Sequence, residues 1–209
     1  MNIKQTQQLN NQTKEEIDYV TCCFSKEKPL IERARAFIQN QYAKLGYVGY
    51  NADFDRMFDE DDASRYFLAI NSKEEILATS RIVMRGAVGL PIEHGLFYGS
   101  NEKVILEDGN IAEMNSFAST SFKIGNKVLS MSTDFILEKD FKITYGLFDL
   151  EKPSIGKLYS RIGAVHSPKY AVPIYFHGYG KQFQNKIVST KWGIMVSDKS
   201  KIIAIKTQM

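Results

Sequence analysis

Hydrophobic residues recur at helical spacing in three segments of this sequence. From Pro29, whose missing N–H does no harm in the first turn of a helix, apolar residues follow at three- and four-residue intervals until Gly46. Segment 124–136 shows the same spacing. Ser154 can cap a shorter helix that ends at Gly163. We therefore predict two long helices and one short one.

Runs of strand length separate these helices. The runs 66–70 and 74–85 meet at the polar turn Asn71-Ser72-Lys73, which predicts a hairpin. Segment 111–119 alternates, and segment 141–150 is a fourth strand. One face of 111–119 carries Ile111, Glu113, Asn115 and Phe117, and the other carries Ala112, Met114, Ser116 and Ala118. We expect the remainder, 171–180 and 191–206, to be rich in strands.

This order of elements predicts an α+β fold, with a mixed, mostly antiparallel sheet flanked by helices. We expect a single domain over 1–209, in which the polar residues 1–19 are loose or form a short strand edge. The chain has 209 residues, of which 44% are hydrophobic, enough for a sizeable core. That composition excludes a disordered segment, a collagen, a coiled-coil rod and a disulfide scaffold.

Charge and targeting signals narrow the function classes. A net charge of +3 without a basic–aromatic motif argues against nucleic-acid binding. No apolar run approaches the roughly 20 residues of a membrane span, and the first residues lack the apolar core of a signal peptide. Cys22 and Cys23 are adjacent, which predicts reduced thiols. We therefore expect a cytoplasmic protein that is not an integral membrane protein.

A set of short landmarks follows one another in a specific order. They are Arg33 and Phe37 in the first helix, Asp53 and Asp55, Arg81 in a strand, Leu90-Pro91, Gly95-Leu96-Phe97, and Glu113 in a strand. This order resembles the acyl-homoserine-lactone (autoinducer) synthases and the N-acyl amino acid synthases, a branch of the GCN5-related N-acyltransferase superfamily. Lactone synthases usually carry Arg where this chain has Ser116, so the resemblance favours the N-acyl amino acid synthases.

The resemblance implies an N-acyltransferase that moves a fatty acyl group from acyl carrier protein, or from acyl-CoA, to the amine of an amino acid or a similar small amine. The coenzyme-A signature is only partly present, at Phe122, Gly125 and Lys127. This suits acyl-phosphopantetheine on a carrier protein as donor, with no permanently bound cofactor. Two alternatives stay open: an autoinducer synthase that uses S-adenosylmethionine, and a catalytically inactive module that binds an acyl ligand or a carrier protein.

Acyl transfer to an amine requires a base, and Glu113 is the candidate. It could instead simply pair with Arg81 on the neighbouring strand. Arg81 could clamp the carboxylate of an amino acid acceptor, because its planar fork matches two oxygens. Six of the ten residues 53–62 are acidic. Asp53 and Asp55 could hold an ammonium group, or belong to a solvated loop. Further substrate-binding candidates are Arg33, Asn115 and Ser116.

The remaining candidates concern the leaving group, the oxyanion and the acyl chain. Tyr159 could protonate the leaving thiolate, or it could be a core tyrosine. Backbone N–H groups near Phe117, Ala118 and Ser119 could hold the oxyanion, or form an ordinary sheet ladder. Candidates for an apolar acyl slot, which could equally be core residues, are Phe97, Met114, Phe117, Met131 and Phe135.

Other charged and metal-ligating residues give weaker signals. Three histidines, His94, His166 and His177, show no metal-binding spacing, and we expect them to be surface or core residues. Residues 181–209 carry six lysines against the single Asp198. That excess could meet an acidic carrier protein, or form a solvated face.

Overall fold

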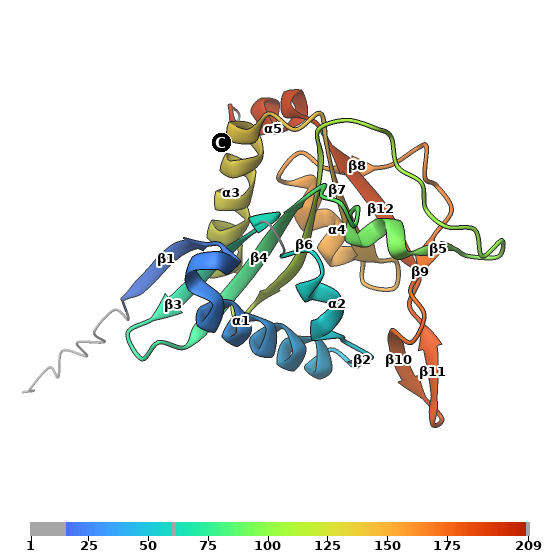
Figure 1. Cartoon of the computed structure of the whole chain (residues 1–209), viewed down its shortest axis with the longest axis horizontal. Coiled ribbons are helices and arrows are strands. Elements are labelled where there is room, and N and C mark those ends of the chain that lie inside the picture. Colours follow the sequence, from blue (N-terminus) through green and yellow to red (C-terminus); the bar gives the residue numbers. More distant parts are fainter. Residues whose placement is uncertain (1–15, 60–61, 208–209) are drawn as a thin grey trace, which may run out of the picture.

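The computed structural model describes residues 16–59 and 62–207 (Figure 1). Within these residues the chain forms a nine-stranded sheet and a three-stranded sheet. Along the large sheet the strands are β1 (Ile17–Cys22), β3 (Ser64–Asn71), β4 (Ile76–Met84), β6 (Ile111–Ser119), β7 (Ile143–Asp149), β12 (Trp192–Ser197), β9 (Ile174–Tyr175) and β5 (Leu96–Phe97), with β8 (Val165–His166) also paired to β12. The small sheet contains β11 (Lys186–Ser189), β10 (Gly180–Phe183) and β2 (Tyr47–Val48).

Helices cover both faces of the large sheet. They are α1 (Phe24–Lys44), α2 (Ala52–Arg56), the 3-10 turn η2 (Pro91–His94), α3 (Phe122–Lys139), α4 (Pro153–Ser160) and α5 (Lys199–Lys206). Successive residues of a strand point to opposite faces. On β3, Phe67 and Ala69 pack with residues of α3, α4 and α5, whereas Tyr66 and Leu68 pack with α1. The structure thus confirms the predicted α+β class with a flanked sheet.

Strands β6 and β7 separate along their length, and this positions the site. They are the parallel pair of a sheet whose other pairings run antiparallel. Their register ends at Met114 opposite Gly146, after which β6 continues beside β4 and β7 continues beside β12. Ser116 lies at a positive φ of 51°, at a bulge where the β4–β6 register shifts. The divergence opens a gap between the central strands.

Several predicted elements have different bounds in the structure. The first helix begins at Phe24, before the predicted Pro29, and a non-helical residue at Glu27 separates its first turn from the rest. Pro29 therefore still stands near the start of a regular helical stretch, where proline is tolerated. The polar segment 71–73 forms the predicted hairpin turn between β3 and β4. Residues 1–15 of the predicted loose segment lie outside the described residues, and the residues that follow form the edge strand β1.

The C-terminal segment contains a helix where the sequence predicted strand. Residues Lys199–Lys206 form α5, whose N-cap Asp198 accepts a hydrogen bond from the Lys201 N–H at 2.9 Å. Such a cap satisfies a donor that the first helical turn leaves unpaired. Ile202 is buried against the α3 side of the sheet. One buried apolar residue anchors this helix, so the cap outweighs the strand preference of the isoleucines. Across the described residues, no helix has the length and apolar character needed to cross a membrane.

Candidate active site

An open cavity of about 430 Å³ lies on the α1 and α2 face of the large sheet, over the gap between β6 and β7. Its polar lining includes Asn51, Asp55, Arg81, Glu113, Asn115 and Ser116. Its aromatic lining includes Tyr42, Tyr50, Phe54, Tyr159, Phe176, Tyr179 and Trp192. A concave site with a few convergent polar groups is the usual form of a small-molecule site. The cavity thus brings together six of the predicted site residues: Asp55, Arg81, Glu113, Asn115, Ser116 and Tyr159.

Glu113 is a buried carboxyl group in the wall of this cavity, with only 1% of its surface exposed. Its Oε2 accepts a hydrogen bond from the Ile92 N–H at 2.7 Å, and its Oε1 accepts one from Asn115 Nδ2 at 3.0 Å. Burial raises the pKa of Glu113 to about 7, although both hydrogen bonds and the charge of Arg81 oppose the rise. A carboxyl group with this pKa can take up and release a proton near neutrality.

Arg81 does not pair directly with Glu113 in the part of the chain that the structure describes. The strand register places it opposite Asn115, and Val83 opposite Glu113. Arg81 Nε donates to Asn115 Oδ1 at 2.8 Å, so one amide side chain separates the two charged groups. The rest of the guanidinium is also engaged, because Nη2 donates to Asp55 Oδ1 at 2.7 Å and Nη1 to the Tyr66 hydroxyl at 3.1 Å. We therefore propose a positioning role for Arg81 in place of the expected carboxylate clamp.

Behind Arg81 lies a buried ionic cluster that the sequence analysis did not predict. Arg35, on the inward face of α1, pairs with Asp59, which also accepts a hydrogen bond from the Ser64 hydroxyl. Asp55 accepts a hydrogen bond from the Tyr50 hydroxyl at 2.6 Å. Asp55 and Asp59 are 6% and 1% exposed, so a solvated loop is wrong for both. They lie four residues apart, a helical spacing that could have indicated a common inward face.

Two of the predicted substrate-binding residues lie outside the cavity lining. Arg33 is exposed on α1 and pairs with Glu74 at 3.7 Å. Asp53 is exposed on α2 and pairs with Arg56. The buried members of the ionic cluster lie two residues further along the same helices, Arg35 on α1 and Asp55 on α2.

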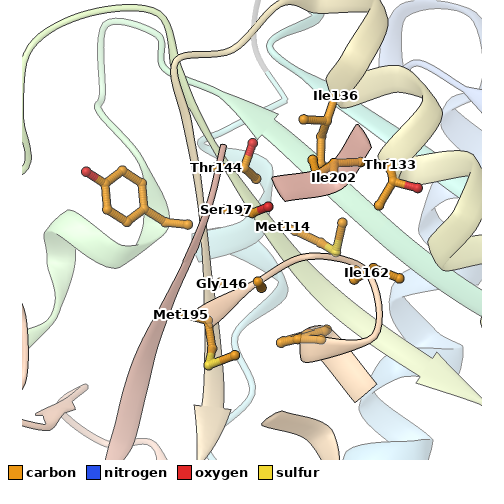
Figure 2. Close-up of a pocket in the computed structure, with 12 residues that line it drawn as sticks. Met114, Thr133, Ile136, Thr144, Gly146, Ile162, Met195, Ser197 and Ile202 are labelled. Carbon is orange, nitrogen blue, oxygen red and sulfur yellow. The ribbon is translucent and has the colours of Figure 1, made fainter. Parts of the chain in front are cut away.

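Tyr159 lies between the large cavity and a second, smaller one, and lines both. The second cavity, of about 20 Å³, lies on the α3 side of the sheet (Figure 2). The labelled residues around it come from β6, β7, β12, α3 and α5 and the turn after α4: Met114, Thr133, Ile136, Thr144, Gly146, Ile162, Met195, Ser197 and Ile202. Tyr159 is 5% exposed, and burial raises the pKa of its hydroxyl above the usual range. It therefore carries its proton at neutral pH.

The bulge in β6 changes which face the following residues occupy. Ser116 lines the cavity together with Asn115, although the two are neighbours in the chain. Phe117 consequently packs on the α3 side, against the core that contains Met114, and not on the face of Glu113 as strict alternation predicts. Ala118 returns to the β4 ladder opposite Thr79. Ser119 accepts a hydrogen bond from the Ser121 N–H and lies beside the start of α3.

The predicted acyl-slot residues are divided between the core and the second cavity. Met114 lines the second cavity. Met131 and Phe135, both on α3, pack in the core on that side of the sheet. Phe97, on β5, packs on the other face and stacks on Tyr170 with ring centroids 6.5 Å apart. These three do not line either cavity.

The aromatic walls of the large cavity were not predicted from the sequence. His94 and His177 are exposed, as expected for surface histidines, and both also line this open cavity. His94 packs edge-on against Phe54, with ring centroids 5.4 Å apart. Tyr179 stacks on Tyr47 at 5.9 Å. The dense aromatic content of segment 175–179 was a signal that could have indicated a cavity wall.

Similar folds occur among solved structures, whereas no family model and no curated protein sequence matches this chain. FeeM, an N-acyl amino acid synthase from uncultured soil microbes, is 16% identical, with a TM-score of 0.63 over 95% of this chain and 100% of that one. Spermidine N-acetyltransferase from Vibrio cholerae, in complex with CoA and spermine, is 12% identical, with a TM-score of 0.54 over 90% of this chain and 98% of that one. The chain therefore has the fold of the GCN5-related N-acyltransferases, as its resemblance predicted.

Proposed function

We propose that this protein is an N-acyltransferase that moves an acyl group from a thioester donor to a small primary amine held in the large cavity. The observation that carries the proposal is Glu113, a buried carboxyl group with a pKa of about 7 in the wall of an open cavity. An amine that enters as an ammonium ion must lose a proton before it can attack a thioester. Glu113 is suited to accept that proton, directly or through a water molecule.

The residues around Glu113 support the later steps. After the amine attacks the thioester carbonyl, the C–S bond breaks and the sulfur leaves as a thiolate. We propose that backbone N–H groups at the bulge around Ser116, where the regular ladder is interrupted, hold the oxyanion. The Tyr159 hydroxyl, which keeps its proton at neutral pH, can stabilise the leaving thiolate by donating a hydrogen bond to it. The aromatic walls favour an acceptor with an apolar or flat body attached to the amine.

The acyl chain has a candidate subsite beyond Tyr159. A chain that passes between β6 and β7 would reach the second cavity, which at about 20 Å³ has room for one water-sized group. A longer chain requires Met114 and Met195 to change conformation, which unbranched methionine side chains allow. A Cβ at Gly146 would lie 3.7 Å from the Tyr159 ring, in van der Waals contact, so the glycine leaves that space unfilled.

A carrier protein remains our proposed donor, with acyl-CoA as the alternative. Phe122, at the first position of the partial coenzyme-A signature, is 61% exposed and offers no charge to a pyrophosphate. The predicted lysine excess is smaller than the sequence suggested, because four of the six lysines pair with acidic residues of this chain. These pairs are Lys181 with Asp149 and Glu151, Lys199 with Asp140, Lys201 with Asp198, and Lys206 with Asp134.

The deciding experiment incubates the pure protein with acyl-carrier-protein and acyl-CoA donors of graded chain length, pooled amino acids and other primary amines. Products are identified by mass spectrometry. We expect an N-acyl product whose rate of formation rises with pH through about 7, as Glu113 loses its proton. Glu113→Gln should abolish most turnover. Glu138→Gln, the same change at an exposed position of α3, should retain it.

Other outcomes would favour the alternatives. A lactone and methylthioadenosine formed from S-adenosylmethionine would identify an autoinducer synthase. Fatty acyl groups that copurify with the protein, without turnover on any amine, would identify a binding module. Full activity of Glu113→Gln would refute the proposed base.

A further inference from the structure

Asn115 connects two buried charged groups that make no direct ion pair in the described chain. Its Oδ1 accepts the hydrogen bond from Arg81 Nε at 2.8 Å, and its Nδ2 donates to Glu113 Oε1 at 3.0 Å. The chemistry of the two neighbours fixes the direction of this chain of bonds. A guanidinium has only donors, so the amide oxygen must face Arg81 and the amide nitrogen must face Glu113.

Such an arrangement transmits charge through a polarised amide. The cation draws electron density toward Oδ1, which makes the N–H group on the far side a better donor to the carboxylate. We propose that Asn115 is a positioning residue that relays the charge of Arg81 to Glu113, so that this carboxyl group is held in a form able to accept a proton at neutral pH. The inference rests on the proposed function for its catalytic meaning, but its physical content concerns Glu113 alone.

The hydrogen bond from Asn115 gives Glu113 an environment between a direct ion pair and burial without any donor. A direct ion pair with an arginine lowers a carboxyl pKa by about one to three units, which would leave a weak base. Burial without any donor would keep the carboxyl group protonated at neutral pH. The charged and titratable groups around Glu113 are Arg81 on β4, Asp55 on α2, Tyr159 on α4 and Tyr145 opposite it on β7, and His94 and His177 line the same cavity. Of these, Arg81 lowers and Asp55 raises the pKa of Glu113.

Two substitutions separate the halves of the relay. Asn115→Leu keeps a similar volume but removes both hydrogen bonds. Asn115→Asp keeps an acceptor for Arg81 and replaces the donor to Glu113 by a second carboxylate. Because the buried arginine keeps a partner in this variant, it allows the test even if the leucine variant fails to fold. Asn40→Leu makes the same change on the exposed side of α1 and serves as the matched control.

The test is a titration of Glu113 itself. It is monitored by ¹³C NMR of protein labelled at the glutamate carboxyl carbons. The resonance is identified by its absence in Glu113→Gln. We expect Asn115→Leu to bind the proton about tenfold more tightly than the wild type, a rise of one pKa unit, because a donor to the charged form is lost. Asn115→Asp should raise the pKa further, and Asn40→Leu should leave it unchanged.

This measurement needs no substrate, so it remains decisive even if the protein turns over no donor. Where activity is found, the acid limb of the pH–rate profile should move upward with the titration. A merely structural role of Asn115 would instead lower the rate equally at every pH. Unchanged titration in both variants would overturn the relay. A lowered pKa in Asn115→Leu would also overturn it, since Asn115 would then separate Arg81 from Glu113 rather than connect them.

Discussion

Glu113→Gln should gain stability relative to the wild type as the pH rises from 5 to 8.5, although it removes the proposed base. The physical reason is the cost of burying a carboxylate. The pKa of Glu113 rises from its ordinary 4.5 to about 7 in the folded protein, a difference of about 2.5 units. At about 1.4 kcal/mol per unit, the charged form therefore costs the folded state about 3 kcal/mol.

The sign follows from proton binding. Between pH 4.5 and 7 the folded wild type binds more protons at Glu113 than the unfolded chain does, so its free energy of unfolding falls as the pH rises. The contribution is fully present below pH 4.5 and is lost above about pH 8. A glutamine at this position has no such dependence. The glutamine should nevertheless lower the free energy of unfolding by about 1–3 kcal/mol at every pH. Its NH₂ group must face either the Asn115 or the Ile92 donor, and that donor then loses its acceptor.

Urea denaturation at pH 5 and at pH 8.5, followed by circular dichroism and by the fluorescence of the single tryptophan, separates the two effects. The difference in unfolding free energy between variant and wild type should shift by about 2–3 kcal/mol in favour of glutamine over this interval. A difference that does not change with pH would refute the raised pKa and with it the argument for a base poised near neutrality.

Two further substitutions test the frame of the site, each against a matched control. Asp59→Asn leaves a buried arginine without its anion and should lower the free energy of unfolding, measured by urea denaturation, by about 3–5 kcal/mol. Asp53→Asn breaks an exposed pair and should lower it by less than about 1 kcal/mol. Equal losses in the two variants would contradict the buried cluster. Gly49→Ala should destabilise the folded protein by at least about 2 kcal/mol more than Gly46→Ala. Both glycines have φ above 80°, but only at Gly49 would the new methyl group meet a backbone carbonyl. Similar melting temperatures for these two variants would contradict the close approach of the chain at Gly49.

The central strand shows how much of the site a sequence can specify. Period-two alternation places Glu113 and Asn115 on one face of the segment 111–119, and its bounds agree with β6. The same rule failed at Ser116, because a bulge inserts one residue and turns Phe117 to the other face. A bulge depends on how two strands pair, and no residue type within 111–119 predicts one.

The ionic cluster shows what local patterns cannot resolve. Hydrophobic periodicity treats every charged residue as outward and does not distinguish Arg33 from Arg35 on α1, although only Arg35 is buried. The resemblance selected Arg33, and nothing in the sequence indicated Arg35. The partners that justify burial, Asp59 for Arg35 and Asp55 for Arg81, lie 24 and 26 residues away in the chain. Only the packing of α1, α2 and β4 brings them together, and the spacing of charges along one helix does not contain that information.

Burial raises the pKa of Glu113, and the charge balance of the surrounding region does not fully offset this rise. Arg35 and Arg81 contribute two positive charges, and Asp59 and Asp55 contribute two negative charges at contact with them. These four charges cancel, so an ionised Glu113 adds a negative charge that no cation of its own offsets. A proton on Glu113 restores neutrality, which burial favours. Asp59 and Asp55 each contact an arginine directly. Glu113 meets Arg81 only through the Asn115 amide and is therefore left to exchange its proton with a ligand in the cavity.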